Sequence, residues 1–422
     1  MYIVYMERRR VVVTGMGVVT PLGNDISSLW SNLLAGVSAA GEITHFDASK
    51  FKTRFACEVK DLDLSHLFDP KEVRRYDQYI HYAIYSADQA IRDAAIEIDH
   101  TNSYRYGVIY GSGMGGVQTL DSNIVAFGVG DGTPHYSPFF IPMIIPNMAS
   151  GMIAQRYGLR GVNYATTSAC ASSAHAIANA YQQVSLGLAD VIVTGGAEAA
   201  IECSGVGGFN ALHALSTRND SPQTACRPFS ASRDGFVLGE GAGTLILEEY
   251  NHALARGAKI YAEIVGLGMT SDAYHMTASD PEGKGAIEAM LQAINSAGIK
   301  AEEIDYINAH GTSTLQGDLA EVKAIQKVFG EYAYKLNITS SKSMHGHLLG
   351  ATGALEAIIS ILSLQHQVVT PTINHSEGDE DPNIDNKLNF TFNQAQQRDI
   401  RYAMSNNFGF GGHNACLIFK KY

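Results

Sequence analysis

Hydrophobic runs that are apolar on both faces alternate with amphipathic segments along most of the chain. Residues 10–19 (RVVVTGMGVV) and 190–198 (DVIVTGGAE) are such runs, which are typical of strands buried inside a sheet. Comparable runs lie at 105–110, 244–249 and 259–266. Helical spacing occurs at 26–34, and the pattern over 71–93 predicts one long amphipathic helix. This alternation predicts an α/β protein with a largely buried sheet.

The segment 163–180 (NYATTSACASSAHAIANA) predicts a short strand, a turn of small residues and a helix, with Cys170 at the turn. The N-terminus of a helix carries roughly +0.5 charge, so we expect the pKa of the Cys170 thiol to lie about one unit below its ordinary 8.5. Small neighbours would let a substrate carbonyl reach the sulfur beside free backbone N–H groups. On this segment alone, a buried structural cysteine is an equally good interpretation.

The second half of the chain repeats the first in outline. Residues 304–314 (IDYINAHGTST) resemble 106–114 (YGVIYGSGM), and 337–355 (NITSSKSMHGHLLGATGAL) resemble the segment around Cys170. Each pair consists of a strand, a small-residue turn and, in the second case, an Ala-rich helix. Two halves of one kind predict an internal duplication with the active site where the halves meet.

Equivalent turns of such a duplication would bring Cys170 close to His310, Lys342 and His347. A cysteine with histidines elsewhere in the chain is a recognised arrangement for nucleophilic catalysis. Metal binding by Cys170, His310, His345 and His347 is an alternative. It is disfavoured because His345 and His347 are only two residues apart and would point in different directions. The histidines could also be satisfied core residues.

Composition narrows the classes of function. The 422 residues carry a net charge of −12, which argues against a nucleic-acid partner. Five cysteines without a CxxC pair predict neither a disulfide framework nor a structural zinc site, and GSGMGG at 111–116 has the wrong spacing for a dinucleotide fingerprint. No apolar run approaches the length of a membrane span, and the first ten residues lack the order of a signal peptide. We therefore expect a cytoplasmic protein without cofactor, translated from Met1 or Met6.

Six motifs resemble, in order, those of the β-ketoacyl-acyl-carrier-protein synthases of the thiolase superfamily. They are TSACASSAHAI, GFVLGEGAG, DAYHMTASDPEG, NAHGTSTLQGD, SSKSMHGHLLGATGALE and NNFGFGGHNACLIFKKY. HLLGA after KSM is closer to synthase II than to synthase I. The resemblance implies a thiolase-like duplicated αβαβα layered fold. Residues 9–258 would carry the cysteine with cap and dimer insertions, and 259–421 would carry the histidine pair.

The implied reaction is a decarboxylative Claisen condensation that extends an acyl chain by two carbons from malonyl-carrier protein. By this resemblance, Cys170 accepts the acyl chain from the acyl carrier protein. His310 and His347 hold the malonyl thioester carbonyl and stabilise the enolate as CO₂ leaves. Lys342 supports the pair, with Glu356 as its buried partner.

The resemblance also implies residues around this centre. The backbone N–H of Phe410, the gating aromatic, would join that of Cys170 in an oxyanion hole, with Phe408 in a supporting place. The positions implied for substrate are Thr312 and Thr314 on the pantetheine arm, Thr277 at the channel mouth and Met114 at the acyl-tail pocket. The positions implied for carrier-protein docking are Lys71, Arg74 and Arg75, a cluster whose other interpretation is a solvated helix face.

Some positions depart from the family pattern: Ser173 for glycine, His345 for threonine, Ser230 for aspartate, and His135 and His213 where basic residues are frequent at the channel mouth. A homodimer is implied by the family, and the apolar segment 137–146 is typical of a subunit interface or a tail pocket. Two alternatives stay open. One is a polyketide-type ketosynthase of the same fold, and the other is a non-catalytic subunit like the chain-length factors, which lack the nucleophilic cysteine.

Overall fold

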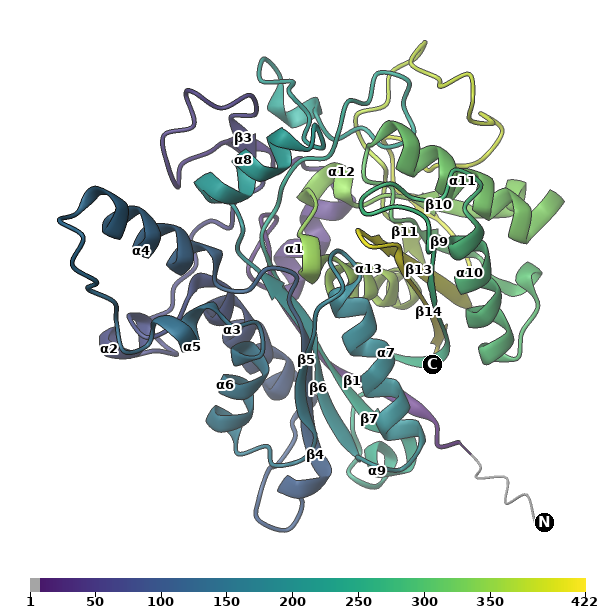
Figure 1. Cartoon of the computed structure of the whole chain (residues 1–422). Helices are drawn as coiled ribbons and strands as arrows, with labels where there is room; N and C mark the ends of the chain where they lie inside the picture. Colours follow the sequence, from purple (N-terminus) through teal and green to yellow (C-terminus); the bar gives the residue numbers. More distant parts are fainter. Residues whose placement is uncertain (1–7) are drawn as a thin grey trace.

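A computed structural model describes residues 8–422, so the choice between Met1 and Met6 lies outside the described residues. One mixed sheet of ten strands runs through the molecule in the order β10-β9-β13-β14-β8-β1-β7-β6-β4-β5 (Figure 1). The strands of the first half are β1 (Val11–Val19), β4 (Tyr106–Gly111), β5 (Asn163–Thr166), β6 (Val191–Glu198) and β7 (Gly241–Glu249). Those of the second half are β8 (Ala262–Ser271), β9 (Tyr306–Asn308), β10 (Asn337–Thr339), β13 (Tyr402–Gly409) and β14 (His413–Lys421).

The strand order is the same in both halves. Counted within its own half, each set of five strands runs third, second, fourth, fifth, first, and the two first strands, β1 and β8, pair antiparallel where the halves join. The five strands predicted from hydrophobic runs are all present, four of them within three residues of the expected ends, while β8 ends five residues later than expected. The predicted duplicated α/β fold is therefore confirmed, while the division at 258/259 stays a prediction.

Helices form three layers around the two half-sheets (Figure 1). The middle layer is α7 (Ser172–Ser185) and α13 (Thr352–His366), which contact each other and strands of both halves. On the outer faces, α3 (Gln78–Ala94) covers β1, β6 and β7, while α10 (Lys284–Ala297) covers β8 and β14 and packs against α11 (Leu315–Phe329). The result is the αβαβα arrangement that the resemblance implies.

Glycines on the first strand of each half let the outer helix lie directly on the sheet. A Cβ built on Gly17 of β1 would stand 2.1 Å from the Ser86 carbonyl oxygen of α3. A Cβ on Gly268 of β8 would stand 1.9 Å from the Ala289 carbonyl oxygen of α10. A side chain at either position would collide with the helix backbone, so glycine is needed for this close contact. The same contact between helix and strand therefore occurs in both halves.

The predicted helix over 71–93 is wrong in one respect, because the structure breaks it into α2 (Pro70–Val73) and α3. Asp77 lies in the break and caps α3 by accepting from the Tyr79 N–H at 3.2 Å. The same carboxylate accepts from the Thr119 N–H at 2.9 Å. A capping residue that also accepts from the first turn of another helix, α4 (Val117–Val129), outweighs the helical periodicity on both sides of it.

The remaining helices are α1 (Ile26–Leu34), α4 (Val117–Val129), α5 (Phe140–Ile144), α6 (Met148–Tyr157), α8 (Cys203–Ala211), α9 (Tyr250–Ala255) and α12 (Lys342–His345). Two short two-stranded ribbons lie outside the main sheet: β2 (Gly41–Glu42) with β3 (Phe55–Ala56), and β11 (Val368–Val369) with β12 (Gln396–Gln397). Within residues 8–422, every helix is too short or too polar to cross a bilayer.

Candidate active site

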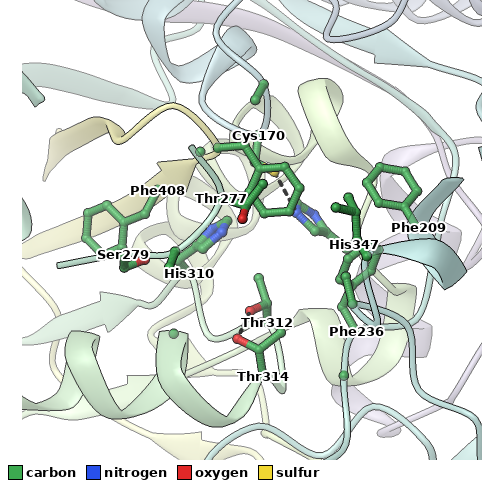
Figure 2. Close-up of a pocket in the computed structure, with 18 of the residues that line it drawn as sticks. Cys170, Phe209, Phe236, Thr277, Ser279, His310, Thr312, Thr314, His347 and Phe408 are labelled. Carbon is green, nitrogen blue, oxygen red and sulfur yellow. Dashed lines mark hydrogen bonds between the residues drawn. The ribbon is translucent and has the colours of Figure 1, made fainter. Parts of the chain in front are cut away.

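A cavity of about 520 Å³ opens where the two halves meet, and Cys170, His310 and His347 all line it. Cys170 comes from the turn between β5 and α7, His310 from the loop after β9, and His347 from the turn after α12. Figure 2 shows the His310 and His347 side chains next to each other beside Cys170, with a dashed line from the sulfur to His347. Residues 140 positions apart in the sequence thus share one cavity because equivalent turns of the two halves converge.

The turn that carries Cys170 is fixed by short-range hydrogen bonds. Ala169 adopts φ +50°, and the Ser172 hydroxyl both accepts from the Ser168 N–H at 2.9 Å and donates to the Ala169 carbonyl at 2.7 Å. Gly409 of β13 lies directly beneath, and a Cβ there would stand 2.7 Å from the Ser168 carbonyl oxygen. Small residues on both segments therefore hold the sulfur at the cavity wall.

The three candidate reactive groups form a tight cluster. His347 Nε2 lies 3.0 Å from Cys170 Sγ, and one ligand atom from each of Cys170, His310 and His347 lies within 4.8 Å of the others. The two imidazole rings are 5.4 Å apart at an interplanar angle of 83°. The proximity expected from the duplication is present, and one ligand atom placed beside the sulfur could reach both rings.

The expected lowering of the Cys170 pKa is wrong. Burial raises the pKa of the Cys170 thiol to about 11, although Lys342 and the Phe410 backbone N–H act to lower it. The sequence could show the helix terminus but not the loss of solvent around the sulfur, and that loss is the larger effect. In the free site the group is a neutral thiol that needs a base when it attacks.

Both imidazoles are neutral at ordinary pH. Burial, followed by the nearby Lys342 ammonium, holds the pKa of His310 and that of His347 well below the usual 6.5. A neutral imidazole offers one N–H donor and one lone pair, whereas an imidazolium offers two donors and no base. The pair is therefore suited to donating hydrogen bonds to an oxygen that becomes negative.

Buried carboxylates hold the segments that carry these groups. Glu321 accepts from the His310 backbone N–H at 2.8 Å and from the Gly311 N–H at 2.7 Å. Lys342 pairs with Glu356, whose other oxygen accepts from Asn407 Nδ2 at 2.7 Å. The pairing of Lys342 with Glu356 was expected. Glu321 was not singled out, because a lone helical glutamate gives no signal in the sequence.

The two imidazoles differ at their other nitrogen. His347 Nδ1 lies 2.9 Å from the hydroxyl of Thr352, at the start of α13. His310 Nδ1 is buried and has no hydrogen-bond partner within residues 8–422. Sequence reasoning missed Thr352, although its place five residues after His347 at the start of a predicted helix was visible.

The same cavity is lined by the four residues expected to contact substrate: Thr277, Thr312, Thr314 and Met114. The expected gate and supporting residues, Phe410 and Phe408, line it as well. The hydroxyls of Thr312 and Thr314 are 3.0 Å apart below the imidazoles (Figure 2). Glu198, another residue that sequence reasoning missed, fixes the Met114 loop by accepting from its N–H at 3.0 Å and from the Gly113 N–H at 2.8 Å.

The basic cluster lies apart from the cavity. Lys71, Arg74 and Arg75 are exposed at α2, and none of them lines the cavity. The Arg75 guanidinium lies 5.3 Å from the centre of the Phe139 ring, next to the apolar α4–α5 surface. His213 lines the cavity as expected at the channel mouth, whereas His135 does not.

The other departures from the family pattern all have partners. Ser173 accepts at 2.9 Å from the backbone N–H of Ala354 and so links α7 to α13. Ser230 lies 3.0 Å from His375 Nδ1. His345 Nε2 lies 2.9 Å from the Ser341 hydroxyl, outside the cluster around the sulfur.

A sulfur and two imidazoles could also supply three ligands to a metal ion. Zinc is bound by such donors at about 2.0–2.3 Å, so the present spacing of up to 4.8 Å is compatible with a common centre. His345 does not complete the set, because it is absent from this cluster of ligand atoms. The cluster therefore fits either a metal centre or a nucleophile with two hydrogen-bond donors.

Comparison with known proteins shows the family of the chain. Residues 8–253 match the family model of the N-terminal domain of beta-ketoacyl synthase, and 261–376 match that of the C-terminal domain. The 3-oxoacyl-[acyl-carrier-protein] synthase 2 of Coxiella burnetii is 48% identical over 416 residues, covering 99% of each chain.

Two solved structures share the fold over nearly the whole chain. A beta-ketoacyl synthase from Burkholderia phymatum is 39% identical with a TM-score of 0.90, covering 98% of this chain and 100% of its own. A ketosynthase bound to a hexaketide, in complex with its type II PKS acyl-carrier protein, gives 32% identity and a TM-score of 0.88, with the same coverage.

Proposed function

Because the chain belongs to the β-ketoacyl synthase family, we propose that it condenses an acyl thioester with malonyl-carrier protein and lengthens fatty acyl chains by two carbons. The observation that carries this proposal is the cluster of one buried sulfur and two neutral imidazoles at the end of a cavity. Such a cluster supplies a nucleophile and two donors for a developing oxyanion.

In the first half-reaction, Cys170 Sγ attacks the carbonyl carbon of the incoming acyl thioester. A new S–C bond forms, the C–S bond to the carrier thiol breaks, and the Cys170 proton ends on the departing carrier sulfur. His347 Nε2, 3.0 Å from Sγ, is placed to relay that proton. Backbone N–H groups of Cys170 and Phe410 would hold the oxyanion, a contribution worth about 2.7–4 kcal/mol per donor in other enzymes.

In the second half-reaction, malonyl-carrier protein enters and its carboxylate leaves as CO₂. The electron pair of the broken C–C bond moves onto the thioester, whose oxygen accepts hydrogen bonds from His310 and His347. The resulting enolate carbon attacks the acyl-enzyme carbonyl, the bond to Cys170 Sγ breaks, and the sulfur takes up one proton. The step needs no strong base, because loss of CO₂ itself generates the carbanion. A buried site assists because it excludes water from the carboxylate.

Product analysis tests this function. Purified protein is incubated with a saturated acyl-carrier protein and malonyl-carrier protein, and the products are read by mass spectrometry. A β-ketoacyl-carrier protein longer by two carbons is expected, with a Cys170 acyl-enzyme as intermediate. Absence of both would refute the proposal. A preference for polyketide intermediates over saturated chains would move the chain to the other ketosynthase class, and tightly bound zinc at Cys170 would favour the metal centre.

The partner that this function requires is an acyl carrier protein, and we propose that Lys71, Arg74 and Arg75 help to dock it. Their exposure leaves them free to meet acidic side chains. Reversing the charge of Arg74 and Arg75 should raise KM for carrier-protein substrates and leave KM for a small malonyl thioester unchanged. Equal effects on both substrates would refute a docking role.

We also propose a homodimer built on the α4–α5 surface and the edge strand β5. Apolar side chains are unusually exposed there, with Val129 82%, Val125 61% and Ile141 58% accessible. β5 pairs with β4 alone among the described strands, which leaves its other edge free for a second copy. Sedimentation should give twice the mass of one chain, and Ile141→Glu should shift it toward the monomer.

Two further expectations remain proposals. A cytoplasmic location is supported by five free cysteines, and cell fractionation tests it. A boundary between halves near 258/259 is supported by the strand order on either side of it. In limited proteolysis, the first cleavage should occur near 258/259, and cleavage within either half should follow later.

A further inference from the structure

The proposed reaction asks His347 for two opposite roles at the same nitrogen. Relaying the Cys170 proton requires a lone pair on Nε2, with the ring hydrogen on Nδ1. Holding the malonyl oxygen requires the hydrogen on Nε2 and the lone pair on Nδ1. A fixed donor beside Nδ1 would favour the Nε2–H tautomer, and a fixed acceptor there would favour the Nδ1–H tautomer, so either would hinder one of the two roles.

We propose that the Thr352 hydroxyl is the positioning group that lets His347 serve both half-reactions, an inference that rests on the proposed function. A hydroxyl has one rotatable hydrogen and two lone pairs, so it accepts from Nδ1–H in one form and donates to Nδ1 in the other. Its distance of 2.9 Å from Nδ1 suits either direction. Thr352 thus acts on the substrate only through His347.

The surroundings leave His347 Nδ1 dependent on this hydroxyl. His347 and Thr352 are both buried, at 2% and 0% exposure, so water does not replace a lost partner freely. Within residues 8–422 the Thr352 hydroxyl makes no other hydrogen bond. The imidazole is also wedged between the Phe236 ring, at 5.2 Å, and the His310 ring, at 5.4 Å, which limits rotation toward another partner.

His310 provides the contrast that makes the assignment specific. It lines the same cavity, yet its Nδ1 has no partner within the described chain, and in the proposed mechanism it only donates. The imidazole that touches the sulfur is therefore the one with an adaptable neighbour. The difference between the two Nδ1 environments agrees with the mechanism, in which only His347 has to change its tautomer.

The test compares Thr352→Val, which keeps the shape without the hydroxyl, with Thr352→Ser, which keeps the hydroxyl. Thr194→Val on β6 is the matched control, since Thr194 is fully buried and its hydroxyl has no partner in the described part of the chain. Thermal unfolding shows that each variant is folded. Three rates are then measured: alkylation of Cys170 by iodoacetamide, acyl transfer to Cys170, and release of CO₂ from malonyl-carrier protein.

Thr352→Val should slow all three rates by about tenfold or more, because it leaves a buried imidazole nitrogen without a partner. Thr352→Ser should recover most of the loss, and Thr194→Val should match wild type. Wild-type rates in Thr352→Val, or no recovery in a folded Thr352→Ser, would overturn the proposal. If wild-type protein formed no acyl-enzyme, the proposed function would fail, while alkylation would still decide whether Thr352 acts on His347 and the sulfur.

Discussion

Replacing Lys342 by methionine tests the contribution of the buried Lys342–Glu356 ion pair to stability most directly. Lys342 and Glu356 are both completely buried and form an ion pair, so the substitution leaves a carboxylate in a site without solvent. Breaking such a pair from one side costs about 3–5 kcal/mol, a large share of the 5–15 kcal/mol that stabilises a typical domain. Methionine retains most of the lysine stem, so the loss of packing contributes little.

The pH dependence of this loss has a defined sign. Burial raises the pKa of Glu356 to about 7 while Lys342 lowers it, so removing Lys342 raises the pKa further. The carboxyl then binds more protons in the folded state than in the unfolded chain, where its pKa is about 4.3. The stability deficit of Lys342→Met relative to wild type should therefore be smallest below pH 7, where both folded proteins keep the Glu356 carboxyl protonated, and should grow as pH rises from about 7 toward the higher pKa of the variant.

Denaturant unfolding of wild type and variant at about pH 5 and about pH 8 measures the loss of stability and its dependence on pH. Lys323→Met is the matched control, because its pair with Glu282 is 3.4 Å long with side chains 43% and 69% exposed. That exposed pair should be worth no more than about 1 kcal/mol. Glu356→Gln added to Lys342→Met should restore stability at the higher pH. Equal deficits in the two single variants, or a Lys342→Met deficit that shrinks as pH rises, would refute this account of the buried pair.

Four shorter predictions concern the cavity. Cys170→Ala should abolish condensation but leave some malonyl decarboxylation, read as CO₂ release, because both imidazoles remain; loss of both would give the sulfur a role in decarboxylation. His310→Ala should lower decarboxylation about 10²–10³-fold by removing an oxyanion donor, and full retention would remove it from the mechanism. Met114→Phe should shorten the longest acyl chain accepted in product profiles; an unchanged profile would place Met114 off the tail path. Gly409→Ala should impair acylation of Cys170, since its Cβ would stand 2.7 Å from the Ser168 carbonyl oxygen, and a wild-type rate would show that the turn yields.

Most of the fold could be predicted from local sequence patterns. Continuous apolar runs predicted β1 and β6 closely, because strands buried on both faces have no polar positions to interrupt them. The convergence of Cys170, His310 and His347 followed from recognising the duplication. A repeat that preserves strand order brings equivalent turns together without any need to know side-chain contacts.

Properties set by burial and by long-range contacts were not visible in the sequence. The Cys170 pKa was predicted in the wrong direction, since desolvation depends on what packs around the turn. Thr352, Glu198 and Glu321 were missed because their roles are hydrogen bonds to other segments. The break before α3 was missed for the same reason, since Asp77 is fixed partly by Thr119.

The sulfur comes from the first repeat and the imidazoles from the second, and α7 meets α13 through the Ser173 to Ala354 hydrogen bond. Neither repeat alone contains a complete set of reacting groups. If the chain is split into two polypeptides between the repeats, the separate fragments should be inactive, and activity should return only when the fragments reassemble. In the proposed mechanism, catalysis therefore depends on the two repeats packing against each other within one polypeptide, so a change that separates them removes activity from both.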